Sequence, residues 1–383
     1  MPRRWDITEL KPGEEPRTLA NELAVHFSTI TNIGKPLTEG DIPRSNNGSG
    51  MIPQMEEDQI EKMLRAYKKT NSRVEGDIPK DLVNPNAKKL AEVLTPIYNA
   101  CFLYKTWPKA WKIETIVPIP KTQSPGSMDD IRPISMTTLW SKLLETLAAQ
   151  FTLQETKNNW NNDQFGGRKG SSTEHVLISI WDKILSGLDT LNGKAVVLAA
   201  VDFSKSFSRC QFQQILKAYQ KLGLSDWGIA MHAAFLSGRE MRIKIGNILS
   251  DPHPVTGGAV QGSVLGVMDH NAVLEYIDEE IEDQKFYKYI DDLTLEEKIE
   301  KDIRTLVDND SEPPTHYFKP PRTQETLEAI SEKCNELGLK INEKKTQLLT
   351  VSNAKNSNNA WITLKDGSAM YSSETMKFTR IHI

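Results

Sequence analysis

Apolar residues recur at positions three and four apart in several segments of the chain, and this spacing is typical of amphipathic helices. The segments are 56–70, 87–104, 171–188, 212–222 and 324–337. Two of these patterns stop at a glycine, Gly223 and Gly338, as helices often do. The pattern therefore predicts at least five helices.

Strand signals fall between these helices. The run Ala195–Val201 is almost continuously apolar, which predicts a strand covered on both faces. Residues 241–245 alternate between apolar and polar, which predicts a half-exposed strand. Shorter strands are predicted at 113–119, 286–290, 293–295 and 346–351. From residue 195 to 351 the order is strand, helix, strand pair, helix, strand, which is typical of a βαββαβ antiparallel sheet with helices on one face.

Two segments are predicted to lack regular structure. Residues 35–55 are rich in Pro, Gly, Ser and Asn and indicate a loop or linker. Residues 306–323 are rich in proline and indicate a surface insertion.

Composition adds few restrictions. The chain has 383 residues, 38% hydrophobic and 26% charged, as in a globular protein of two to three domains. No apolar run approaches the ~18 residues of a membrane span, and the N-terminus lacks the apolar core of a signal peptide. We expect an intracellular protein of the nucleus or cytoplasm, not secreted, without a membrane partner. The cysteines lack metal-ligand spacing and fit reduced thiols. They are Cys101, Cys210 and Cys334.

The net charge of −4 argues against a uniformly basic nucleic-acid surface. Lysines and aromatic residues are nevertheless interleaved between residues 104 and 121. This segment indicates either a basic cleft or an ordinary set of solvated lysines, and the sequence leaves both interpretations open.

Candidate chemistry centres on three aspartates. Asp291 and Asp292 belong to a Tyr-Ile-Asp-Asp sequence beginning at Tyr289, and Asp202 closes the apolar strand at 195–201. Nucleotidyl transfer uses two divalent metal ions about 3.5–4 Å apart, which carboxylates from a turn and a neighbouring strand end can hold. Alone, the Asp pair could be a hairpin turn and Asp202 a helix N-cap.

Further candidates are weaker when taken singly. Phe207 is either a ring that excludes a 2′-hydroxyl or a core residue. The glycine-rich turn that contains Gln261 and Gly262 would let backbone approach phosphate or base. Arg132 and Arg168 suit triphosphate recognition. Lys345 could protonate leaving pyrophosphate, although each of these charged residues could also be an ordinary surface residue.

Taken in order, these segments resemble the reverse transcriptases of non-LTR (LINE-type) retrotransposons from about residue 55 to the C-terminus. The blocks are Trp111 with Val117–Lys121, Ile131–Ser135, Lys142–Glu145, Gln164–Gly166 with Arg168–Gly170 and Ser172–Thr173, Val201–Lys205, Gln261–Ser263, Tyr289–Asp292, and Asn342 with Lys345–Thr346.

The resemblance implies an α+β right-hand polymerase with fingers and a ferredoxin-like palm sheet. It divides the chain into an N-terminal extension and linker (1–55), fingers with the start of the palm (56–194) and palm (195–383). Asp202, Asp291 and Asp292 would be the catalytic acids and, with the backbone carbonyl of Phe203, would bind two Mg²⁺ ions, or Mn²⁺.

It also implies roles for other residues. Phe207 would be the sugar gate, and Gln261 and Gly262 would contact template and incoming nucleotide. Arg132, Arg168 and Lys121 would hold the triphosphate, and Lys345 would be the general acid. The partners would be an RNA template, a DNA primer and deoxynucleotides, while the oligomeric state stays open.

The chain departs from the family pattern at three places. Val260 replaces the usual proline, Ser208 stands where aspartate is common, and the stretch after Ser263 lacks the usual Leu-Ser-Pro-rich run. Residues 376–383 resemble the primer-grip region, after which we expect no thumb. The alternatives are a non-catalytic RNA-binding remnant and a viral RNA-dependent RNA polymerase. Tyr289 and Phe207 argue against the viral class.

Overall fold

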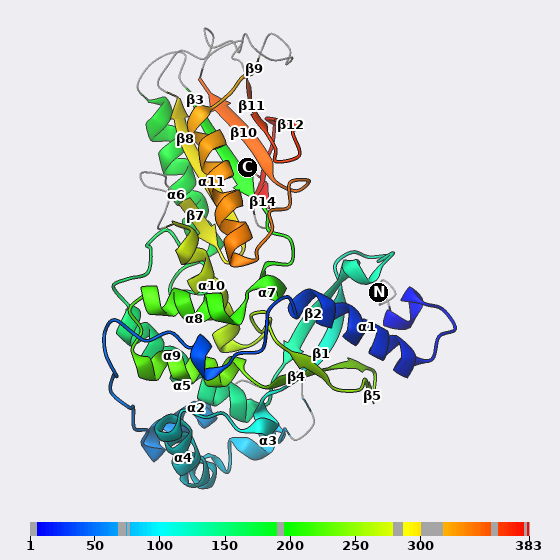
Figure 1. Cartoon of the computed structure of the whole chain (residues 1–383), viewed down its shortest axis with the longest axis vertical. Helices are drawn as coiled ribbons and strands as arrows, with labels where there is room; N and C mark the ends of the chain where they lie inside the picture. Colours follow the sequence, from blue (N-terminus) through cyan, green and yellow to red (C-terminus); the bar gives the residue numbers. More distant parts are fainter. Residues whose placement is uncertain are drawn as a thin grey trace. The chain divides into compact units, whose positions relative to one another are not determined.

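The computed structural model describes residues 6–67, 74, 77–189, 195–278, 286–299, 317–353, 359–378 and 381–382. The chain forms two compact units, each built from two separate stretches of sequence (Figure 1). The first unit contains residues 1–159 and 207–272, and the second contains 160–206 and 273–383. No helix within the described ranges is long and apolar enough to cross a membrane.

The first unit is built on a mixed sheet with strand order β2-β1-β4-β5 and β6 paired to β4. Its strands are β1 (Ile113–Pro120), β2 (Ile131–Met136), β4 (Arg239–Ile245), β5 (Ile248–Leu249) and β6 (His253–Val255). β1 pairs antiparallel with β2 and parallel with β4. The predicted alternation in β4 is confirmed, because Met241, Ile243 and Ile245 are buried while the residues between them are more exposed.

Helix α1 (Pro16–Thr31) contacts β4, β5 and β6 of this sheet. Its buried residues include Leu19, Leu23 and Phe27, which are four positions apart and form one face of the helix. Residues 1–55 were predicted to be an extension and linker, so this helix was not predicted.

Further helices complete the described part of the first unit. They are α2 (Glu57–Ala66), α3 (Lys80–Val83), α4 (Ala87–Tyr104), α5 (Leu139–Thr156), α8 (Phe212–Lys221) and α9 (Asp226–Leu236), with short 3-10 turns η1 (Ile7–Leu10), η2 (Glu39–Asp41), η3 (Lys109–Trp111) and η4 (Met128–Asp130). Phe102, Phe151 and Trp227 meet edge to face at centroid distances of 5.3–6.2 Å. Helices α7 (Ser206–Arg209) and α10 (Val264–Asp278) begin in one unit and end in the other.

The second unit contains an antiparallel sheet with strand order β10-β3-β8-β7. Its strands are β3 (Ala195–Val201), β7 (Phe286–Tyr289), β8 (Asp292–Ile299) and β10 (Gln347–Ser352). Numbered along the chain, these strands lie in the order 4-1-3-2, which is the order of a ferredoxin-like βαββαβ sheet. The predicted mixed α+β fold is confirmed.

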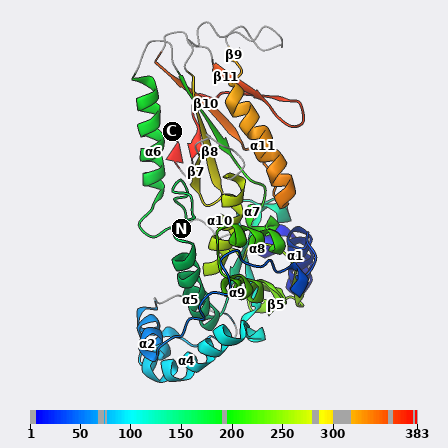
Figure 2. The same cartoon turned by 60° about the vertical axis from the view of Figure 1, so that its left-hand side comes forward.

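Helices α6 (Thr173–Leu188) and α11 (Pro321–Leu337) cover opposite faces of this sheet (Figure 2). Val196 packs in a core with α6, whereas the neighbouring position on the other face, Val197, lies opposite Glu297. The Glu297 carboxylate accepts hydrogen bonds from the backbone N–H and hydroxyl of Thr323 in α11, at 2.7 and 2.6 Å. Burial on both faces explains the continuously apolar sequence of β3.

The helix predicted at 212–222 for the βαββαβ motif is α8 of the first unit, so the end of α10 is the helix that joins α11 on one face of this sheet. The end of α10 lies on the α11 side, where Glu275 pairs with Lys288 of β7 at 3.5 Å. Lys333 of α11 also contacts the ring of Tyr276. Helix α6, which precedes the motif, covers the second face.

Short strands complete the described part of the second unit. They are β9 (Tyr317–Phe318), β11 (Asn359–Thr363), β12 (Ala369–Tyr371), β13 (Lys377–Phe378) and β14 (Ile381–His382). Most of the predicted insertion 306–323 lies outside the described residues, and its last residues form β9 and the start of α11. The division into extension, fingers and palm at residues 55 and 194 stays a prediction.

Candidate active site

The second unit brings Asp202 and Asp292 to neighbouring positions at one end of its sheet. The antiparallel register pairs Val201 of β3 with Leu293 of β8, so its continuation sets Asp202 beside Asp292. Directly opposite residues share a face of the sheet and have Cβ atoms ~5 Å apart. Ala200 and Thr294, one pair further in, are opposite each other on the side covered by α6. Asp202 and Asp292 therefore lie on that same side.

Asp291 lies in the tight turn of the β7–β8 hairpin. Tyr289 pairs with Asp292, which leaves Ile290 and Asp291 as the two connecting residues. Ile290 has a backbone φ of +58°, a left-handed conformation that a β-branched residue rarely adopts. The turn is therefore held in a strained conformation immediately before the two carboxylates.

The backbone around Asp202 is held by the segment before β10. The N–H of Asn342 donates to the carbonyl of Asp202 at 2.7 Å, and the N–H of Ser204 donates to the carbonyl of Lys340 at 2.8 Å. These two bonds flank Phe203, which forms an antiparallel bridge with Ile341. In such a pair the carbonyl of Phe203 is not used by the ladder and points away from Ile341.

Lys345 belongs to this same segment. Its N–H donates to the carbonyl of Asn342 at 3.0 Å, and its side chain is exposed. The next residue, Thr346, accepts a hydrogen bond from the N–H of Asp202 through its hydroxyl at 3.5 Å. The turn that carries Lys345 is thus attached to the strand end that carries Asp202.

The donor set suits a hard divalent cation, because carboxylate and carbonyl oxygens are the ligands that Mg²⁺ and Mn²⁺ prefer. In the described ranges, however, no three His, Cys, Asp or Glu side chains are gathered as a metal-binding group. Each of the three aspartates also interacts with another group of the protein. A metal role for them therefore rests on donor chemistry and strand register.

Arg168 lies in a loop of the same unit, where its guanidinium donates to the carbonyl of Asn161. Burial lowers the pKa of Arg168, and the nearby carboxylates of Glu275 and Asp163 oppose that shift. Part of its hydrogen-bonding capacity is therefore used inside the protein. Its predicted role as a triphosphate ligand stays a prediction.

In the first unit, the loop before α10 is fastened to the end of β2. The N–H of Ser135 donates to the carbonyl of Gln261 at 2.8 Å. Gly262 has φ of +118°, and a Cβ there would lie 2.5 Å from the carbonyl oxygen of Ser135. A Cβ on Gly257 would likewise lie 2.3 Å from the carbonyl oxygen of Thr31. These glycines permit close approach to protein backbone, and the approach to a phosphate or base stays a prediction.

A buried carboxylate then fixes the start of α10. Glu145 of α5 is fully buried, and its Oε2 accepts from the N–H groups of Val264 and Leu265 at 2.8 and 3.4 Å. Its Oε1 accepts from the hydroxyl of Ser141 at 3.0 Å. A negative charge at a helix N-terminus is favourable because the free N–H groups point at it. Glu145 thereby holds the end of the Gln261–Ser263 loop.

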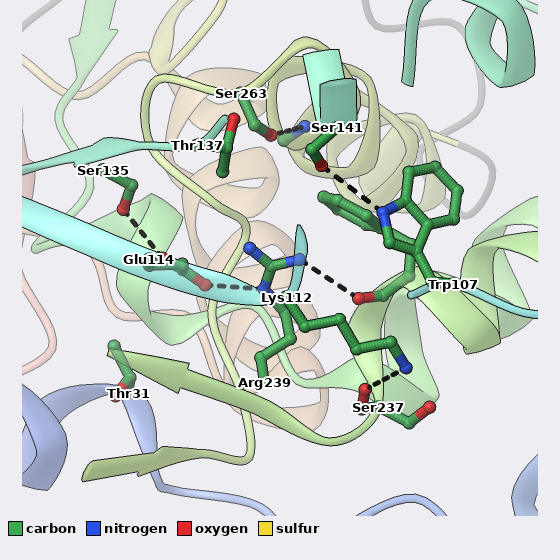
Figure 3. Close-up of polar contacts among 12 residues, drawn as sticks. Thr31, Trp107, Lys112, Glu114, Ser135, Thr137, Ser141, Ser237, Arg239 and Ser263 are labelled. Atoms are coloured by element: carbon green, nitrogen blue, oxygen red, sulfur yellow. Dashed lines mark hydrogen bonds and ion pairs between the residues drawn. The ribbon is translucent and has the colours of Figure 1, made fainter. Parts of the chain in front are cut away.

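Strand β2, which is hydrogen-bonded to this loop through Ser135, is supported by a buried ion pair between β1 and β4 (Figure 3). Glu114 of β1 accepts from Arg239 of β4 at 2.7 Å and from the hydroxyl of Ser135 at 2.8 Å. Arg239 and Glu114 are 1% and 4% exposed, so the pair is shielded from water. Nearby, Lys112 donates to the carbonyl of Ser237 at 2.9 Å, and burial lowers its pKa to about 8.

Phe207 stacks on His270 of α10. The two rings are nearly parallel, at 7° with centroids 4.2 Å apart. His270 is buried, which lowers its pKa to about 3, while Phe207 stays partly exposed. One face of the predicted sugar-gate ring is therefore fixed by a neutral imidazole.

The remaining predicted nucleotide ligands lie in the β1–β2 hairpin. Arg132 is exposed on β2 opposite Ile119, and the Lys121 amine donates to the carbonyl of Asp129 at 2.6 Å. Trp107, which suggested a basic aromatic cleft, is 3% exposed and belongs to the core. Trp107 therefore does not contribute an exposed aromatic side chain to the basic cleft that was one interpretation of residues 104–121.

Comparison with known proteins agrees with this architecture. Residues 119–382, more than half of the chain, match the family described as reverse transcriptase (RNA-dependent DNA polymerase). The chain therefore belongs to the reverse transcriptase family, as the sequence motifs predicted. Members of this family generally use divalent metal ions.

Two similar curated proteins come from non-LTR transposons of Drosophila melanogaster. The chain is 30% identical over 176 residues to a "Probable RNA-directed DNA polymerase from transposon BS", which is 45% of this chain. It is 27% identical over 178 residues to the "RNA-directed DNA polymerase from mobile element jockey", 46% of this chain. Each match spans 19% of the relative's own length.

The structure places the predicted residues in two groups. Asp202, Phe203, Arg168, Asp291, Asp292 and Lys345 belong to the second unit; Lys121, Arg132, Phe207, Gln261 and Gly262 belong to the first. Sequence reasoning assigned no role to Glu145 or His270. Two sequence features could have indicated them. Glu145 is an acidic residue next to the apolar residues of Lys142–Glu145, and His270 lies in the unusual sequence after Ser263.

Proposed function

We propose that this chain is an RNA-directed DNA polymerase that adds deoxynucleotides to a primer 3′-hydroxyl on an RNA template. The observation that carries the proposal is the antiparallel register that sets Asp202 beside Asp292, with Asp291 in the adjoining turn. Family membership supports the same reaction.

Two Mg²⁺ ions bound by these carboxylates would lower the pKa of the primer hydroxyl and stabilise negative charge on the leaving oxygens. The 3′-oxygen forms a bond to the α-phosphorus of the nucleotide as the bond between the α-phosphorus and the bridging oxygen breaks. The hydroxyl proton is lost to solvent, and pyrophosphate leaves. Lys345 would donate a proton to that pyrophosphate.

The other residue roles belong to the same proposal. Arg132, Arg168 and Lys121 would bind the triphosphate, and Gln261 and Gly262 would contact template and nucleotide. Phe207 would select deoxynucleotides by excluding a 2′-hydroxyl. The stacking of Phe207 on His270 supports this role, because it holds the phenylalanine ring in one orientation.

Primer extension tests the proposal. The purified chain is given an oligo-dT primer on poly-rA with Mg²⁺ and dTTP, and in parallel with UTP. We expect extension with dTTP and strong discrimination against UTP. Equal use of UTP would favour the RNA polymerase alternative, and folded protein that binds the template without extension would favour the non-catalytic remnant.

The control variants separate chemistry from folding. The double change Asp291→Ala with Asp292→Ala should abolish extension. Asp182→Ala, which removes an exposed carboxylate on α6 of the same unit, should leave it unchanged. Extension that survives the double change would contradict the assigned acids.

A further inference from the structure

The turn that carries Asp291 has an additional chain segment alongside it. Residues 163–166 run parallel to β7, with the N–H of Phe165 donating to the carbonyl of Lys288 and the N–H of Lys288 donating to the carbonyl of Asp163, both at 2.8 Å. This segment adds to the edge of the sheet at the strand that leads into the turn. It therefore extends the hydrogen-bonding ladder beyond the four strands.

One side chain of this segment reaches the turn itself. Gln164 is 1% exposed, and its Oε1 accepts from the N–H of Ile290 at 3.3 Å and from the N–H of Gly166 at 2.9 Å. Gln164 and Ile290 are 126 residues apart in sequence. A single amide oxygen thus joins the supporting segment to the residue with positive φ.

Gly166 completes the contact because it has no side chain. A Cβ at this position would lie 2.3 Å from the backbone nitrogen of Ile290 and 2.6 Å from its Cγ1. Such a contact cannot be accommodated without moving the turn. The backbone of the supporting segment therefore packs directly against Ile290.

We propose that Gln164 is a positioning residue for the catalytic turn. By accepting the Ile290 N–H it holds Ile290 at its left-handed φ, and this conformation directs the two following carboxylates. Residues held in a sparsely populated conformation persist only where the surroundings determine them, and Gln164 with Gly166 supplies those surroundings. The inference rests on the proposed polymerase function and assigns it a new residue.

The test is the Gln164→Met change, which keeps the length of the side chain and removes the acceptor. Hydrogen exchange of the Ile290 amide is expected to accelerate at least about tenfold, because that N–H loses its partner. In primer extension, kcat is expected to fall about 10–100-fold, as small misplacements of reacting groups do. The KM for dTTP and the Kd for primer–template should stay within about twofold of the parent.

Repeating the Gln164→Met change in an Ile290→Gly chain distinguishes loss of positioning from loss of stability. Glycine adopts positive φ without strain, so in an Ile290→Gly chain the turn no longer needs Gln164. The further loss of kcat caused by Gln164→Met should then shrink to about threefold or less. Gln154→Met, at an exposed position of α5, serves as the matched control and should change neither readout.

The proposal is overturned if Gln164→Met leaves kcat and Ile290 exchange unchanged, or if its effect on kcat is equally large in the Ile290→Gly background. An inactive parent chain would instead refute the proposed function. The exchange measurement needs no turnover, so it still decides whether Gln164 holds the turn.

Discussion

The Gln261–Ser263 loop of the first unit and the Tyr289–Asp292 turn of the second are both fixed by residues from far along the chain, but by different physics. The loop depends on charge: Glu145 accepts from the first N–H groups of α10, and Glu114 and Arg239 form a buried ion pair below Ser135. The turn depends on a neutral amide, Gln164, and on the missing side chain of Gly166.

This difference has consequences for stability. A buried charge is strongly destabilising when its partner is lost, whereas a neutral hydrogen bond contributes about 1 kcal/mol net. We therefore expect the loop to be sensitive to the removal of charge. The turn should respond instead to changes in shape and hydrogen bonding.

The largest expected effect comes from breaking the ion pair on one side. Arg239→Met leaves Glu114 buried without its partner and should lower the free energy of unfolding by about 3–5 kcal/mol. Combining Arg239→Met with Glu114→Leu should recover a large part of this loss, because no charge is then stranded. Urea denaturation measures both.

Arg17 provides the matched control, because its pair with Asp251 has both side chains about 60% exposed. Arg17→Met should change stability by about 0–1 kcal/mol. If the single Arg239 change were no worse than this control, the claim that the first unit depends on buried charge would be wrong.

The next largest effect concerns the loop backbone. Gly262→Ala would bring a Cβ within 2.5 Å of the Ser135 carbonyl oxygen, and the resulting displacement should lower primer-extension activity about 100-fold. Gly246→Ala also places a side chain at a positive φ, +58°, but meets no atom within 4 Å. Its activity should match the parent, and equal losses in both variants would show that strain, not contact, matters.

A smaller effect is expected at the start of α10. Glu145→Gln preserves size but removes the negative charge facing the helix N-terminus, and should lower the free energy of unfolding by about 1.5–3 kcal/mol. Glu92→Gln, at an exposed position of α4, should stay within about 0.5 kcal/mol. A neutral effect at Glu145 would mean that charge is not what fixes the loop.

A pH dependence of stability is also expected from His270 of the first unit. Burial lowers the pKa of His270 from 6.5 to about 3. Below pH 6.5, therefore, the His270 imidazole binds a proton in the unfolded chain but not in the folded chain. Stability is then lost as pH falls from 6.5 towards 3, at about 1.4 kcal/mol per pH unit.

His270→Phe keeps a ring against Phe207 and removes the titrating group. The difference in unfolding free energy between parent and variant should therefore change along that slope in urea titrations from pH 7 to 4. A constant difference across this range would contradict the buried neutral state of His270.

Local sequence patterns predicted strand β3 and the β7–β8 hairpin, because burial and chain direction at these places depend on neighbouring residues. The continuous apolar run of β3 followed from burial on both faces, and the hairpin followed from apolar residues on either side of two aspartates. Family motifs indicated Asp202, Asp291 and Asp292, which lie at the end of β3 and in the β7–β8 hairpin, and their catalytic role stays a prediction. Helix α1 was missed although Leu19, Leu23 and Phe27 recur at helical spacing and a proline stands at its first position, where proline is favoured.

The supporting residues could not be predicted in the same way. The helix that carries Glu145 was not among the predicted helices, and no local pattern indicates that Glu145 accepts from N–H groups 119 and 120 residues away. Likewise, no local signal relates Gln164 to the positive φ of Ile290. Such contacts depend on tertiary packing, which a single sequence does not specify locally.

The central claim is that Asp202 and Asp292 act together at the end of the β3–β8 pair. Single-turnover primer extension with Asp202→Asn, Asp292→Asn and the double variant tests it most directly. Residues that act as one unit are not additive, so the double variant should be no slower than the slower single variant, and both single variants should lose at least about 1,000-fold. Losses that multiply in the double variant, or a single variant with the parental rate, would contradict the account.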